Sequence, residues 1–193
     1  MGWFHDFSAP LWELFAGNAL FLGCSLLYLA WWAVSFRPGA SGFGPVGGVC
    51  LAGAFLTGFA ALYLLGRGVA ELAPRSHGVP VHWVLLGAAV SYAVLLVVTA
   101  VCFHRPVTSE LLIMHIWAAV ELSAAAVLGG TGRVAPAGAA ALAALVGAAT
   151  VAGVICYVAY YHLSGAAGYR EGMVPLAADA AVMAVFLAVQ ALA

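Results

Sequence analysis

Residues 108–128, TSELLIMHIWAAVELSAAAVL, form an apolar run that nevertheless contains two glutamates and a histidine. The run matches the ~20 residues that a transmembrane helix needs to cross a bilayer. A charged side chain at the centre of such a helix costs roughly 2.5–3.5 kcal/mol or more on insertion scales. Glu121 lies close to the middle of the run. We therefore expect Glu121 to have a partner, a cavity or a neutral state.

The whole chain has the composition of an integral membrane protein. Of its 193 residues, 66% are hydrophobic and only 7% are charged, and the mean hydropathy is +1.10. Soluble domains average about 25% charged residues. Because so few charges cannot cover a water-facing surface, the composition predicts a protein embedded in a membrane. We expect a bacterial-type inner membrane.

Six apolar runs predict an all-α fold with six transmembrane helices in a single bundle over residues 1–193. The runs are 11–36, 45–71, 82–103, 108–128, 137–163 and 173–193. Each is near or above the length needed to span a bilayer as a helix. An open sheet could not satisfy its backbone hydrogen bonds in lipid. The connectors are short, so any functional site is expected among the helices or at their ends.

The two halves of the chain, approximately 1–104 and 105–193, resemble each other at an offset of 95–97 residues. The clearest match aligns RSHGVP at 75–80 with REGMVP at 170–175. Because each half holds three spans, the second copy would enter the membrane from the opposite side. The pattern therefore predicts two inverted three-helix repeats. The six arginines divide evenly between the two sides, so the positive-inside rule does not give an orientation.

Four polar side chains within the spans are candidates for binding a solute or ion: Asn18, His115, Glu121 and Asp179. Glu121 is expected to be the main anchor, and Asn18 is the counterpart of His115 in the repeat. A structural role, with each group hydrogen-bonded between helices, is the alternative. Asp179 lies about one turn inside the last predicted span, so it is either a first-turn cap or an intramembrane carboxylate.

Helical phase separates His115 from Glu121. At 100° per residue, Glu121 continues a stripe through Glu110, Met114 and Trp117. His115 lies about 120–140° away from that stripe around the helix axis. We therefore expect His115 and Glu121 to face different neighbours.

Four charged side chains near span ends are candidates for a pore mouth or a gate: Glu13, Arg67, Glu71 and Glu110. Arg67 and Glu71 are spaced i, i+4, which predicts an ion pair on one helix face. Glu13 and Glu110 lie near span starts, where hydration or helix capping would satisfy a carboxylate.

The sequence lacks H-E-x-x-H, G-x-S-x-G and a glycine-rich phosphate loop, so no catalytic residue, metal site or cofactor is predicted. The chain has no lysine and a net charge of −1, which argues against binding nucleic acid.

The leading hypothesis is a channel or secondary transporter for a small solute or ion, with a polar site near the membrane midplane. One alternative is a redox subunit associated with quinone or haem, which would use His115 and His162. The other is a non-catalytic lipid-binding or scaffold protein. Membrane lipids are the expected partners, and assembly into a homo-oligomer stays open.

Overall fold

The computed structural model describes the chain except residues 1–7, 40–43, 103, 105–108 and 161. The described part contains six long helices and a short 3-10 turn, and no strands. They are α1 (Ala9–Ser35), α2 (Pro45–Leu72), η1 (Ala73–Arg75), α3 (Val81–Cys102), α4 (Ser109–Gly130), α5 (Pro136–Tyr160) and α6 (Gly165–Leu192). All six helices are long and apolar enough to cross a membrane. The prediction of an all-α fold with six helices able to span a membrane is confirmed.

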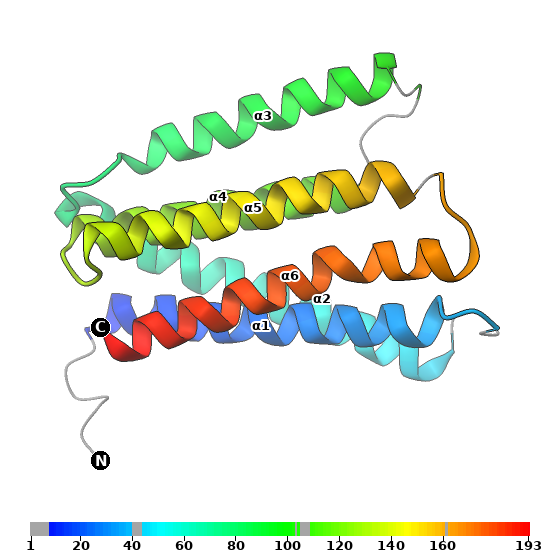
Figure 1. Cartoon of the computed structure of the whole chain (residues 1–193). Coiled ribbons are helices and arrows are strands. Elements are labelled where there is room, and N and C mark those ends of the chain that lie inside the picture. The colour runs from blue at the N-terminus through cyan, green and yellow to red at the C-terminus, as the bar shows by residue number, and fades with distance from the viewer. Residues whose placement is uncertain (1–7, 40–43, 103, 105–108, 161) are drawn as a thin grey trace.

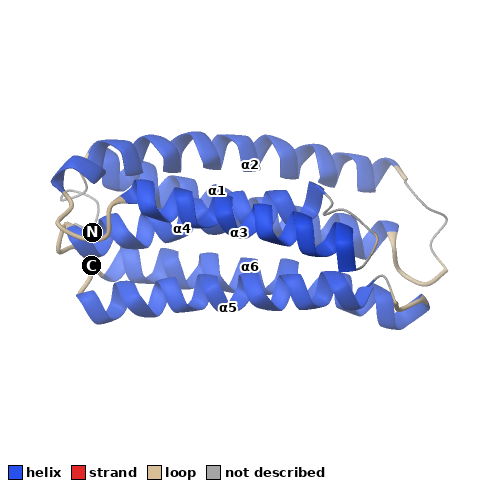
Figure 2. Cartoon of the chain, turned by 90° about the horizontal axis from the view of Figure 1, so that it is seen from above, coloured by secondary structure: helices blue, strands red, loops and turns tan. Residues whose placement is uncertain are grey.

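The helices lie side by side and run alternately in opposite directions (Figures 1 and 2). Five of them form a closed circuit of contacts, in which α1 packs on α2, α2 on α4, α4 on α5, α5 on α6, and α6 on α1. We call this circuit the five-helix ring. Helix α3 lies outside it and packs chiefly against α4, as Figure 1 shows. The peripheral position of α3 leaves one face of α4 only partly covered.

Prolines and glycines mark the helix ends in the expected way. Proline occupies the first turn of α1 and α2 and the first position of α5, where its missing N–H would have no helical partner. Gly132 adopts φ +73° just after α4. In the same turn, the N–H of Val134 donates to the carbonyl of Leu128. This left-handed glycine reverses the chain between α4 and α5.

Helix α6 begins eight residues before the predicted span, at Gly165 instead of residue 173. The glycine-rich segment 165–172, interpreted as a connector, is helical. A glycine inside a helix costs only about 1 kcal/mol, which tertiary packing offsets. Here the indole of Trp32 packs against Gly172, where a Cβ atom would clash with it. Its Nε1 donates a hydrogen bond of 3.0 Å to the carbonyl of Tyr169.

The earlier start of α6 changes the position of Asp179 in its helix. Pro175 lies inside α6 and does not begin it. Asp179 is therefore near the middle of a helix of 28 residues. The interpretation of Asp179 as a first-turn cap is wrong, because the carboxylate lies in the middle of a helix that is long and apolar enough to span a membrane.

Helices α1 and α2 approach each other through glycine. A Cβ atom on Gly17 would lie 2.6 Å from Cγ of Leu65 and 3.1 Å from its backbone nitrogen. A Cβ atom on Gly68 would lie 2.9 Å from the side chain of Leu14. Small residues allow this close backbone packing in membranes, where the hydrophobic effect does not drive helices together. Large apolar side chains then fill the ring interior, including Leu14, Leu65, Leu142, Val146, Met183 and Phe186.

Gly17→Ala is expected to destabilise the bundle, because the added methyl group has no room beside Leu65. Overpacking of this kind costs about 1–3 kcal/mol. Gly23→Ala on the same helix is the matched control, since a Cβ atom there meets nothing within 4 Å. Thermal unfolding in detergent, followed by tryptophan fluorescence, compares the two variants. Equal unfolding temperatures for both would contradict the close α1–α2 contact.

Candidate functional site

Two polar side chains lie inside the five-helix ring at the same depth. Asn18 lies nine residues after the start of α1, and Glu121 lies nine residues before the end of α4. Both helix ends are at the same end of the bundle (Figure 1). At 1.5 Å per residue, both side chains are therefore about 14 Å from that end. Met183, nine residues before the end of α6, shares this depth. All three residues have zero exposure.

The polar atoms of these two side chains have no hydrogen-bond partner among the described residues. This holds for Nδ2 and Oδ1 of Asn18 and for both carboxylate oxygens of Glu121. Each buried polar group left unpaired costs about 1–3 kcal/mol. The large majority of buried polar side-chain atoms in proteins do have a partner. Two such groups, fully buried at one depth on α1 and α4, therefore form the candidate site.

A separate polar cluster lies one to two helical turns further from the same end of the bundle. Asp179 is 13 residues from the end of α6, and its Oδ1 is buried without a described partner. The carboxylate lies within electrostatic range of the Cys24 thiol, which contacts the side chain of Thr57. The Thr57 hydroxyl donates to the carbonyl of Gly53 at 2.8 Å. This cluster joins α1, α2 and α6.

Cys24 and Thr57 were not among the sequence candidates. Cysteine in an apolar run is usually a small buried hydrophobe, and threonine is common in such runs. Their proximity to Asp179 depends on how three helices pack. The sequence alone shows only that the Thr57 hydroxyl can donate to the carbonyl of Gly53 in its own helix, and this does not point to Asp179.

His115 faces away from Glu121, in agreement with the helical phase. Its Nδ1 lies 2.8 Å from the carbonyl oxygen of Leu111, and its ring centroid is 5.5 Å from that of Tyr92 on α3. His115 lines a groove of about 790 Å³ between α3, α4 and α5. Asn18, Glu121 and Asp179 do not line this groove. The structure does not place His115 with the three other predicted binding residues.

The pair proposed for haem, His115 and His162, is not brought together. His115 is 6% exposed and lies six residues inside α4. His162 follows the end of α5 and is exposed. Their depths differ by roughly 12 Å at 1.5 Å per residue, so they do not face each other as paired axial ligands. Within the described residues, no three His, Cys, Asp or Glu side chains converge.

Three of the four charged residues predicted near span ends form a cluster. Nη2 of Arg67 lies 3.1 Å from Oε1 of Glu13 and 3.2 Å from Oε1 of Glu71. The predicted Arg67–Glu71 pair is confirmed. The link to Glu13 was not predicted, because it joins α1 to α2 and depends on their packing. The side chain of Glu110, in the first turn of α4, lies outside the described residues.

No protein-family model matches the chain, and no curated protein or solved structure matches it significantly.

Replacing Glu121 by methionine is expected to stabilise the protein. Methionine is flexible and apolar, and it removes an unpaired buried carboxyl group that costs about 1–3 kcal/mol. For a chain of this length, each kcal/mol raises the unfolding temperature by about 2–4 °C. Glu171→Met is the comparison variant, because it replaces a partly exposed carboxylate near the start of α6 that contacts the Cys156 thiol, and it is expected to give no such stabilisation. A lower unfolding temperature for Glu121→Met would mean that the carboxyl group has a strong partner.

Proposed function

We propose that this protein is a secondary transporter for a small cation or polar solute, with its binding site inside the five-helix ring at Asn18 and Glu121. The observation that supports this proposal most strongly is the unmet hydrogen-bonding capacity of both side chains at one depth. Polar groups of this kind are expensive in a membrane and mark substrate and ion pathways.

Charge balance narrows the solute class. An ionised Glu121 would be an uncompensated charge among apolar side chains, because no cation of the described residues contacts it. Desolvation of such a charge is too costly unless a positive partner arrives. A proton or a small cation would supply that partner. The Asn18 side chain, which offers both an oxygen and an amide group, would complete the coordination.

Enclosure favours a carrier over an open channel. The Glu121 oxygens are inaccessible in this conformation, so a solute reaches them only if the ring opens. The Arg67–Glu13 ion pair joins α1 to α2 near one end of the bundle and is a candidate gate on that side. Asp179, with Cys24 and Thr57, lies beyond Glu121 toward the other end and offers a second polar step.

An inverted duplication is part of the proposal. Alternate helix directions place α1 and α4 in opposite orientations, as an inverted three-helix repeat requires (Figure 1). The α1–α6 contact has its counterpart in the α4–α3 contact. Two observations argue against a close structural match between the two halves. Helices α5 and α6 pack together while α2 and α3 do not pack extensively, and segments 75–80 and 170–175 adopt different structures. The proposed copies have therefore diverged.

The groove beside His115 supports a second candidate function, a lipid-binding membrane protein in which the interior polar groups only specify packing. It is about 790 Å³ in volume and does not reach Glu121. Under this alternative the chain would bind an apolar ligand laterally without moving a solute across the bilayer. Flux measurements distinguish the two candidates.

Purified protein in liposomes is expected to take up protons or a small cation, and Glu121→Gln is expected to reduce that flux at least tenfold. Glutamine keeps the shape of the side chain but cannot balance a positive charge. An entrapped pH-sensitive dye measures protons, and tracer uptake measures Na⁺, K⁺ and ammonium. Glu171→Gln makes the same exchange at a partly exposed carboxylate near the start of α6 and should retain full flux. Absence of flux for every probe, or equal flux in both variants, rejects the transporter.

A further inference from the structure

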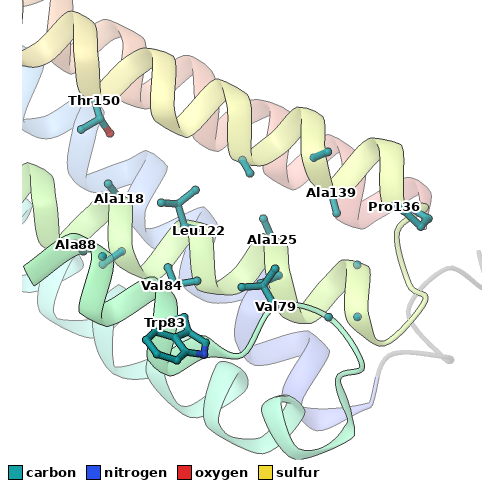
Figure 3. Close-up of a pocket in the computed structure, with 18 of the residues that line it drawn as sticks. Val79, Trp83, Val84, Ala88, Ala118, Leu122, Ala125, Pro136, Ala139 and Thr150 are labelled. Carbon is teal, nitrogen blue, oxygen red and sulfur yellow. The ribbon is translucent and has the colours of Figure 1, made fainter. Parts of the chain in front are cut away.

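The groove between α3, α4 and α5 is lined by residues of all three helices and of the turn before α3 (Figure 3). It exists because α3 packs on α4 without extensive contact to α5. The walls are mostly alanine and glycine. Along α4 they extend from His115 to Gly130, a length of about 22 Å at 1.5 Å per residue. In Figure 3, Ala118 and Leu122 of α4 and Ala139 of α5 project into the same space.

One end of the groove carries a buried histidine whose hydrogen-bonding state can be deduced. Nδ1 of His115 lies 2.8 Å from the carbonyl oxygen of Leu111. A carbonyl oxygen only accepts hydrogen bonds, so Nδ1 carries the proton. In the neutral ring, Nε2 is then an acceptor. The structure gives no hydrogen bond to Nε2, although the residue is only 6% exposed and lines the groove.

Two hydroxyl groups line the groove in the same region, and their donors are also occupied. The hydroxyl of Thr150 on α5 donates to the carbonyl of Val146 at 2.8 Å. The hydroxyl of Ser91 on α3 donates to the carbonyl of Ala88 at 2.9 Å. Each oxygen keeps acceptor capacity. This end of the groove therefore offers acceptors from three helices and no spare side-chain donor among the residues described there.

The described lining contains no Asp, Glu, Lys or Arg side chain, so a ligand with a charged headgroup has no counterion there. The ring of Tyr92, which does not line the groove, packs against the ring of His115 at a tilt of 64°. Such edge contacts between aromatic rings are favourable and hold the imidazole in place. The remaining groove is long, narrow and apolar, as a hydrocarbon chain requires.

We propose that this groove binds a lipid-soluble quinol, with a ring hydroxyl donating to Nε2 of His115 and the hydrocarbon tail lying along α4 between α3 and α5. The quinol form donates hydrogen bonds, whereas the oxidised quinone only accepts them. The site should therefore discriminate between the two redox forms by hydrogen-bond direction. Glu121 does not line the groove, so this inference is independent of transport.

The test measures binding of a labelled decyl benzoquinol to the full chain in lipid nanodiscs under anaerobic conditions. The oxidised decyl benzoquinone and the dimethyl ether of the quinol serve as comparison ligands, because neither donates a hydrogen bond. We expect the quinol to bind about five- to tenfold more tightly than either one, the effect of one buried hydrogen bond. Equal affinity for the three compounds, or no saturable quinol binding, overturns the proposal.

Variants locate the site. His115→Phe keeps an aromatic ring beside Tyr92 but lacks Nε2, so the preference for quinol should disappear. Thr150→Val is a nearly isosteric change that removes a hydroxyl acceptor and should reduce the preference for quinol. This variant tests the same site if His115→Phe does not fold. Ala143→Phe fills the groove and should abolish binding of all three compounds.

Ala144→Phe adds the same ring on the exposed, neighbouring position of α5 that does not line the groove. It should bind the quinol like the unmodified chain. Equal binding by the Ala143→Phe and Ala144→Phe variants, each confirmed as folded by its thermal unfolding, would place the ligand elsewhere and overturn the proposal.

Discussion

The packing of α4 between α2 and α5 is the contact on which the bundle depends. The most apolar stretch of α4 is 67% buried inside the protein, compared with 6% for α3 and at most 28% for the other helices. Without α4 the ring would open between α2 and α5. Because the helix is enclosed on most of its surface, its centre can hold a carboxylic acid away from lipid. Both Glu121 and His115 depend on this position.

Local periodicity explains what could be predicted from the sequence. The six helices follow from hydropathy, since each apolar run exceeds the thickness of the hydrocarbon core. The opposite orientations of His115 and Glu121 follow from 3.6 residues per turn, which does not depend on neighbouring helices. The Arg67–Glu71 pair likewise needs only one helix.

Features that depend on contacts between helices could not be predicted. The start of α6 is set by the Trp32 indole on Gly172, whereas glycine content alone indicated a connector. The common depth of Asn18 and Glu121 depends on ring closure, and sequence matching had paired Asn18 with His115 instead. The contacts between Arg67 and Glu13 and among Cys24, Thr57 and Asp179 also cross between helices. The spacing of residues along one helix does not show which residues of a neighbouring helix lie beside them.

The turn before α3 has a consequence for the shape of the groove. The N–H of His77 donates to the carbonyl of Gly130 at 3.0 Å. A Cβ atom on Gly130 would lie 2.6 Å from the backbone nitrogen of Gly78, so the turn before α3 and the end of α4 pack together through these two glycines. This contact fixes one end of α3 against α4, while few contacts hold its outer face. The glycine pair therefore sets the separation of α3 and α4 at this end of the groove, where a side chain at either position would force the two helices apart.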